Sequence, residues 1–255
     1  MKENFKTEKH KELHQELHRE FYLTCEKYYI FELLTVAAGM MGLYTYNLRG
    51  GVFSNAQTGN IVKMSMAVGS GEFGEGLYYL IPFAAYILGT VISEILPQKV
   101  RKTHFIRWDT MLVGIEIIAL FILGFVPLSL PEQIAQIVIS FLCSMQFNTF
   151  RQAEGVPMAT TFITNHVRQI GISLARILRK NEREQEIEAR QKAEKHAKII
   201  FAFFFGGAVM TFACRYFAEK SIWLTIIPLA LCFAFLLRSD LIYEKAMLDL
   251  TPHGH

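Results

Sequence analysis

Long apolar runs alternate with shorter polar segments along most of the chain. An α-helix needs about 20 predominantly apolar residues to cross the hydrocarbon core of a bilayer. Six runs approach that length, at residues 30–48, 77–96, 108–126, 134–150, 199–217 and 222–237. The pattern therefore predicts an all-α integral membrane protein with six transmembrane helices.

Two polar segments interrupt this pattern. The first, Gly50 to Lys63, begins with two glycines that can end the preceding helix, and Ser54 or Asn55 can then cap a new helix that extends to about Ser70. The second, residues 155–171, occupies the same position after a later apolar run. Amides and hydroxyls are costly beside lipid unless they face protein or water. We therefore expect two broken or re-entrant polar helices in addition to the six spans.

The distribution of Lys and Arg predicts the topology. If neither polar helix crosses fully, most basic residues fall on one side, which the positive-inside rule assigns to the cytoplasm. The segments on that side are 1–29, 99–107, 181–198 and 239–255. Three spans are an odd number, so a second three-span unit is inverted relative to the first. We expect one transmembrane domain, 30–238, of two inverted repeats, about 30–126 and 133–238, with both termini cytoplasmic.

Composition narrows the class of protein further. The chain is 52% hydrophobic, and its net charge of only +3 does not indicate a nucleic-acid surface. Its start is charged and has no leading apolar core, so we expect no cleavable signal peptide. Four cysteines, without a C-x-x-C pair, suggest reduced or buried thiols. They are Cys25, Cys143, Cys214 and Cys232.

The charged segments outside the apolar runs favour solvated helices. In 181–198, Glu and basic residues recur four apart, as in Glu186 with Arg190 and Glu194 with Lys198, which is the stabilising order on a helix surface. A soluble binding role is the alternative. Near the N-terminus, His10, His14 and His18 share helical spacing. They fit either a metal pair or the polar face of an interfacial helix.

Small and amide side chains of the two polar segments form the predicted binding site. Their oxygens could ligate a small polar solute or cation, and the alternative is that they only hold helices together. Paired, interrupted polar segments in inverted halves favour a transporter-type central site. The candidate residues are Asn55, Gln57, Thr58, Asn60, Gln146, Asn148, Thr160, Thr161, Thr164, Asn165 and His166.

Glu116 is the candidate for proton or ion coupling, because it lies in the middle of the third apolar run. An ionised carboxylate is expensive at that depth. It is either a protonatable functional group or one member of a pair with a cation such as Arg215.

Two motifs support a resemblance to a known family. The first comprises Tyr-Thr-Tyr at 44–46, Arg-Gly-Gly-Val-Phe at 49–53 and Asn-Ala-Gln-Thr-Gly-Asn-Ile-Val at 55–62. The second comprises Met-Gln at 145–146, Asn148, Phe-Arg at 150–151 and Ala-Thr-Thr at 159–161. With these motifs the chain resembles the YoaK family of bacterial multi-spanning membrane proteins. The resemblance implies the bacterial inner membrane and no particular reaction.

The sequence departs from that family at two places. Asn165-His166 stands where the second motif usually repeats Gly-Asn, and Gly42 stands where the family generally has Asp. Any mechanism that requires that acid or that glycine turn is therefore in doubt for this chain.

The expected function is transport or channel conduction of an unidentified small polar solute or ion. The alternative is a non-transport membrane scaffold or partner protein whose polar motifs only join helices. No nucleophile elbow, zinc-protease helix or phosphate-binding loop occurs, so we expect no enzyme, cofactor or bound metal. The expected partners are the lipid bilayer and the solute, with no nucleic acid, and a homo-oligomer is left open.

Overall fold

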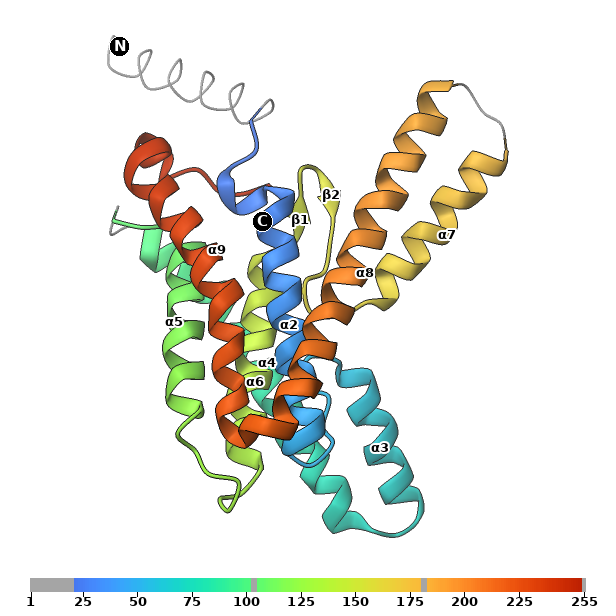
Figure 1. The fold of residues 1–255 in the computed structure, drawn as a ribbon, viewed down its shortest axis with the longest axis vertical. Helices are drawn as coiled ribbons and strands as arrows, with labels where there is room; N and C mark the ends of the chain where they lie inside the picture. The colour runs from blue at the N-terminus through green and yellow to red at the C-terminus, as the bar shows by residue number, and fades with distance from the viewer. Residues whose placement is uncertain (1–20, 102–104, 180–182, 254–255) are drawn as a thin grey trace, which may run out of the picture.

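The computed structural model describes residues 21–101, 105–179 and 183–253, and helices dominate it (Figure 1). The helices with apolar runs are α2 (Tyr28–Leu48), α4 (Phe73–Arg101), α5 (Trp108–Leu123), α6 (Gln133–Thr149), α8 (Arg183–Phe217) and α9 (Ile226–Arg238). The polar helices are α3 (Gln57–Gly69) and α7 (Thr164–Leu178). The predicted helical class is confirmed. His10, His14 and His18 lie outside the described residues.

Short elements complete the described chain. Two-residue strands β1 (Gln152–Ala153) and β2 (Val156–Pro157) form an antiparallel hairpin between α6 and α7. Short helical turns occupy Thr24–Glu26, Ala218–Thr225, Ser239–Tyr243 and Lys245–Met247.

Two helices extend beyond the apolar runs that predicted them. α4 continues through Pro97 to Arg101, because a proline lacks one backbone donor but has a helical φ. α8 joins the charged segment and the fifth apolar run into one helix, with no proline between them. Two of the predicted pairs on its polar part are formed, Glu186 with Arg190 and Glu194 with Lys198, each at 2.6 Å.

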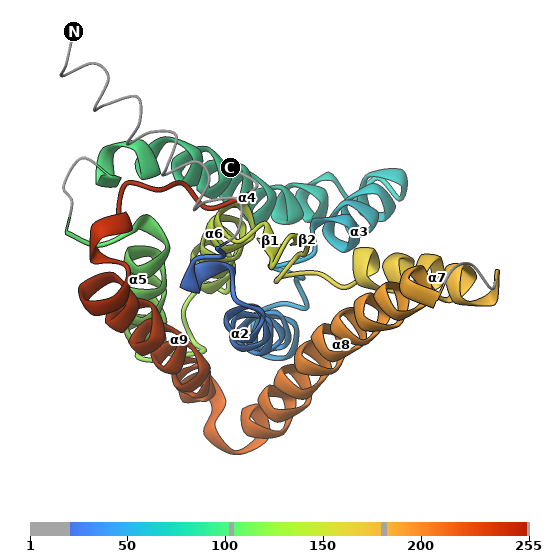
Figure 2. The ribbon, with the colours of Figure 1, turned by 90° about the horizontal axis from the view of Figure 1, so that it is seen from above.

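The chain alternates direction through α2, α4, α5, α6, α8 and α9, so the start of α2 and the C-terminal tail lie at the same end (Figure 1). Seen from above, α2 lies inside, with α4, α5, α8 and α9 around it (Figure 2). Ile30, Leu34, Ala38 and Met41 of α2 are fully buried, which agrees with this central place.

The helix pairing repeats when the two halves of the chain are exchanged. α2 packs on α8, and α6 packs on α4. The polar helices follow the same rule, with α3 on α4 and α7 on α8, while α5 packs on α9. Exchanging the set α2–α5 with the set α6–α9 therefore reproduces the main contacts.

Glycines permit both of the largest helix contacts. A Cβ at Gly39 of α2 would overlap the backbone of Phe203 in α8, and one at Gly206 of α8 would overlap the backbone of Val36. A Cβ at Gly89 of α4 would overlap the backbone of α6 at Phe141. Backbones that approach this closely require small residues.

The two polar helices do not pack chiefly on each other. α3 lies at the lower end of Figure 1 beside α4, and α7 lies toward the upper end beside α8. Each begins part-way along the bundle and runs outward, in opposite directions (Figure 1). The expectation of one joint site between the polar helices stays a prediction, and their main packing partners are α4 and α8.

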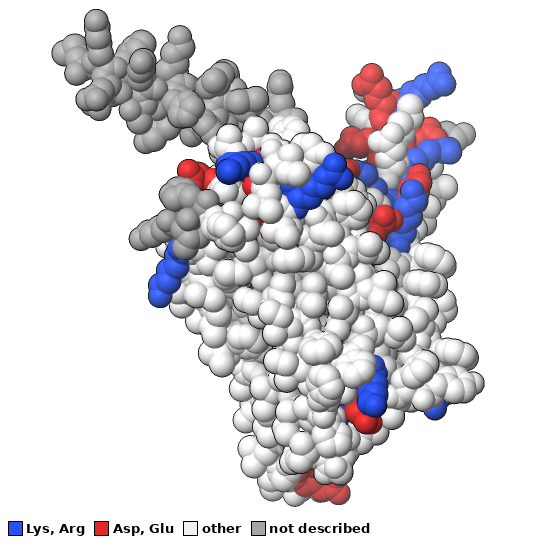
Figure 3. Space-filling model, turned by 60° about the vertical axis from the view of Figure 1, so that its left-hand side comes forward, with Lys and Arg blue, Asp and Glu red and all other residues white. Residues whose placement is uncertain are grey.

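By length and composition, two helical runs of the described residues suffice to cross a membrane: Phe73–Arg101, and the run from Arg183 to Tyr243, in which the chain reverses between α8 and α9. The outer surface is strongly apolar. Ile118 of α5, Phe204 and Phe212 of α8 are each at least 62% exposed. Figure 3 shows a broad face without charge, with Lys, Arg, Asp and Glu gathered toward the two ends.

Candidate functional site

The turn between α2 and α3 depends on glycine. Gly50 and Gly51 have φ values of +74° and +66°, in the left-handed region that glycine tolerates without strain. A Cβ at Gly50 would also overlap the hydroxyl of Tyr78 from α4. The Gly-Gly pair therefore reverses the chain where α4 lies against it.

Asn60 closes this turn from within α3. Its Oδ1 accepts a hydrogen bond from the Phe53 N–H at 3.0 Å, and its Nδ2 donates to the Phe53 carbonyl at 2.9 Å and to Gln57 Oε1 at 3.0 Å. Gln57 Nε2 donates in turn to the Ser54 carbonyl at 3.1 Å. α3 starts without the predicted side-chain cap. Both amides are thus engaged by the turn itself, as the structural alternative requires.

Asn55 and Thr58, the other candidates of the first motif, lie in different environments. Asn55 is buried, and its Nδ2 donates to the Ala38 carbonyl of α2 at 3.2 Å. A Cβ at Gly42 would overlap the Asn55 amide, so glycine at 42 makes room for that contact. Thr58 is exposed on α3 and is not part of an internal site.

Gln146 and Asn148 of α6 also lie in different environments. Gln146 is fully buried, and its Nε2 donates to the Leu34 carbonyl of α2 at 3.3 Å. Asn148 donates to Glu94 Oε2 at 3.0 Å, and Arg151 pairs with the same carboxylate at 2.7 Å. Asn148 therefore belongs to an ion-pair cluster where α4 and α6 end.

The candidate residues at the start of the second polar segment differ in their burial. Thr160 and Thr161 are fully buried, and the Thr160 hydroxyl has no hydrogen-bond partner in the described part of the chain. Thr164 is exposed and Asn165 is half-buried at the first turn of α7. Of these four residues, the two threonines before α7 are the ones that are fully buried.

His166 forms a cross-link between α7 and α8. Its Nε2 lies 2.8 Å from the Ala159 carbonyl, and its Nδ1 lies 2.9 Å from Nδ1 of His196. A carbonyl only accepts, so Nε2 of His166 carries the proton and, in the neutral ring, Nδ1 accepts from His196. Nε2 of His196 is then an acceptor, which is buried and unpartnered among the described residues. This arrangement of donors and acceptors fits two neutral imidazole rings.

The two motifs meet on α2. Asn55 donates to the carbonyl of Ala38, and Gln146 donates to the carbonyl of Leu34, one turn earlier on the same face. Several buried oxygens of this interior lack a hydrogen-bond partner in the described chain. They are the hydroxyls of Thr35, Ser54, Ser140 and Thr160, and Oε1 of Gln146. Buried groups of this kind usually bond to water or a ligand.

Glu116 is fully buried in α5, and neither of its carboxylate oxygens has a partner among the described residues. The alternative of a pair with Arg215 is wrong, because Arg215 is exposed on α8 and the Glu116 oxygens have no partner among the described residues. A buried, unpaired carboxyl is expected to carry a proton.

Arg49 is a buried residue that is not among those predicted for the binding site. It is 0% exposed, its Nη2 donates to the Val126 carbonyl at 2.6 Å, and its Nη1 donates to the Pro127 carbonyl at 3.2 Å. Tyr44 accepts two further bonds from the same guanidinium, and Gln136 donates to the Arg49 carbonyl. In the sequence, its position directly before Gly50 and Gly51 was the feature that could have identified Arg49 as part of the site.

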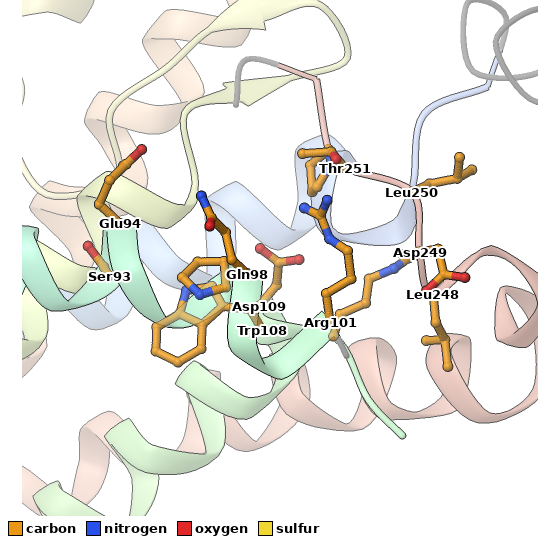
Figure 4. Close-up of a pocket in the computed structure, with 13 residues that line it drawn as sticks. Ser93, Glu94, Gln98, Arg101, Trp108, Asp109, Leu248, Asp249, Leu250 and Thr251 are labelled. Carbon is orange, nitrogen blue, oxygen red and sulfur yellow. The ribbon is translucent and has the colours of Figure 1, made fainter. Parts of the chain in front are cut away.

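Two hollows in the described part of the chain lie outside this interior. One cavity of about 610 Å³ opens between the end of α4, the start of α5 and the C-terminal tail, with Arg101 and Asp109 side chains at its centre (Figure 4). A second, about 630 Å³ and almost wholly apolar, follows α8 beside Gly207. None of the residues predicted for the binding site lines either hollow.

Comparison with known proteins identifies a family. A family model described as a protein of unknown function (DUF1275) matches residues 30–235. The chain belongs to the DUF1275 family. No curated protein and no solved structure matches it.

The unpartnered polar groups in the interior of this DUF1275 protein are mainly hydroxyl and amide oxygens. Oxygens of this kind can accept hydrogen bonds or coordinate a cation. No group of three or more metal-ligating side chains occurs in the described ranges.

Proposed function

We propose that this protein is a six-span inner-membrane protein built from two inverted repeats, with both termini cytoplasmic. The spans are α2, α4, α5, α6, α8 and α9. The charge-free, apolar outer face in Figure 3 supports a lipid environment. The pairing of helices that survives exchange of the halves supports the repeat. The motif resemblance supports membership of the YoaK family of bacterial membrane proteins.

We further propose that it moves a small polar solute or ion across that membrane. One observation carries this proposal: Asn55 of the first motif and Gln146 of the second donate to carbonyls one turn apart on the central helix α2, and Gln146 Oε1 remains buried without a partner among the described residues. Transporter folds with inverted repeats place their sites at such interruptions. Glu116, buried without a partner, is the group proposed for proton coupling.

Flux through proteoliposomes tests this function. Urea and glycerol are followed by light scattering, and Na⁺, K⁺ and H⁺ by entrapped or potential-sensitive dyes. We expect at least one probe to equilibrate faster than in protein-free liposomes, and Gln146→Leu and Thr160→Val to slow it. Ser65→Ala is the matched control, because Ser65 lies on the exposed part of α3. Flux equal to that of protein-free liposomes for every probe would contradict transport.

The second candidate is a membrane scaffold, with a second copy or another envelope protein as its partner. It is favoured by the local engagement of Asn60 and Gln57, whose bonds all stay within the turn. The α7–α8 hairpin, which extends beyond the bundle in Figure 1, would be the docking element. A protein without flux that retains a defined oligomer in membranes would favour this reading.

A further inference from the structure

α7 has an apolar stripe that the rest of the chain leaves uncovered. Val167, Leu174 and Leu178 are spaced seven and four apart, so they lie on one helical face. Their exposed fractions are 58%, 50% and 81%. The face that packs on α8 is a neighbouring one, marked by the buried His166 and Ser173.

Arginines lie on one side of the uncovered stripe. Arg168 and Arg179 are about 100° from it around the helix, Arg176 is on the opposite face, and α7 contains no Asp or Glu. None of the three forms an ion pair within the described ranges, unlike Arg190 and Lys198 of the adjoining part of α8. A helix with an apolar stripe and a purely basic polar face is suited to the boundary between lipid headgroups and acyl chains.

The position of α7 agrees with that boundary. The His166–His196 contact holds its first turn level with residue 196, three residues before the apolar run of α8 begins at Ile199. From there the hairpin leans outward from the bundle, with α7 on its outer, lower side in Figure 1. α7 thus begins close to the level at which the apolar run of α8 begins, and it rises outward from there (Figure 1).

We infer that α7 is an interfacial helix that binds anionic lipid headgroups at the cytoplasmic surface. Val167, Leu174 and Leu178 enter the acyl boundary, and Arg168 and Arg179 contact lipid phosphates. Each arginine near an anionic surface contributes about fivefold to binding. The inference rests on the membrane location proposed above and is independent of transport.

Site-directed spin labelling in nanodiscs tests it. Single cysteines replace Leu174, Leu178, Ile118 or Glu188 in a chain whose four native cysteines, all buried, are changed to Ala. Each is labelled and compared in phosphatidylcholine and in phosphatidylcholine with phosphatidylglycerol. Ile118, 62% exposed on α5, is the reference for hydrocarbon, and Glu188 on α8 is the reference for water.

We expect labels at 174 and 178 to collide with oxygen more than with a water-soluble nickel chelate when phosphatidylglycerol is present. Arg168→Gln with Arg179→Gln should abolish the difference between the two lipid mixtures. Aqueous labels at 174 and 178 in both mixtures, with the 118 label still in hydrocarbon, would overturn the inference. Shielding accompanied by spin–spin broadening would also overturn it and assign the stripe to a second copy. An aqueous 118 label would instead refute the membrane location.

Discussion

At the scale of single residues, buried amides and hydroxyls differ in what their hydrogen bonds reach. Asn60 and Gln57 bond to the turn that precedes α3, so their loss disrupts local structure. Gln146 donates through its Nε2 to the Leu34 carbonyl of α2, and its Oε1 has no partner among the described residues. We therefore expect Asn60 and Gln57 to contribute mainly to stability. We expect Gln146 to contribute mainly to the binding of a solute in the interior.

Asn60→Ala should therefore lower stability. The substitution leaves the Phe53 N–H and carbonyl without their side-chain partner, which costs about 1–3 kcal/mol for buried groups. Thr58→Ala, on the exposed side of the same helix, should change stability by less than about 0.5 kcal/mol. Thermal unfolding in detergent measures both. Equal melting temperatures for the two variants would return Asn60 to the list of ligand-binding candidates.

Glu154, in the hairpin between β1 and β2, should make stability depend on acid pH. Burial raises the pKa of Glu154, but its hydrogen bond and ion pair with Lys195 outweigh that effect, so the pKa is lowered from 4.5. A lowered carboxyl pKa stabilises the folded state above the unfolded pKa, and this contribution is lost as pH falls through the folded value.

Glu154→Gln should accordingly destabilise the protein at pH 7 by about 0.2–1 kcal/mol, since the pair is a third exposed. Unfolding of the variant and the wild type is compared at pH 7 and below pH 4. The difference should shrink at the lower pH, and a difference that grows there would contradict the assignment.

At the scale of elements, close backbone contact decides how the halves join. Gly39 and Gly206 bring α2 onto α8, while Gly89 brings α4 onto α6. These contacts occupy equivalent places under exchange of the two halves. Side chains larger than hydrogen at these positions would separate the helices and unsettle the interior between them.

Gly206→Ala should destabilise the bundle by about 1–3 kcal/mol, because its Cβ would meet the Val36 backbone, which cannot move aside as a side chain could. Gly74→Ala in α4 is the control, since nothing lies within 4 Å of a Cβ there. That control should be neutral or stabilising by up to about 1 kcal/mol. Thermal unfolding of both variants is the measurement, and a neutral Gly206→Ala would show that the helices can separate without cost.

At the scale of the whole molecule, the alternating helices place the α3–α4 turn and the C-terminal tail at opposite ends (Figure 1). Charges lie mainly at those ends, so a bilayer around the middle is the arrangement with the least cost of desolvation. These two facts, together with the basic residues of the segments that we assign to the cytoplasm, support the proposed topology.

Cysteine accessibility in intact cells should reflect that topology. In the chain without native cysteines, Glu72→Cys in the α3–α4 turn should react with a membrane-impermeant maleimide from outside. Glu188→Cys in the hairpin should react only after the cells are opened. Labelling of residue 188 in intact cells would contradict both the six-span arrangement and the cytoplasmic position of α7.

The linear sequence determined the helical class, most helix positions and the likeness of the two halves, because apolar period and length depend on neighbours along the chain. It also singled out Asn55, Gln146 and Thr160 as polar residues among apolar ones. Only the tertiary structure decided which partners these side chains have. The carbonyls of Leu34 and Ala38, the partner of His166 and the isolation of Glu116 all depend on helices distant in sequence, and only packing brings those together.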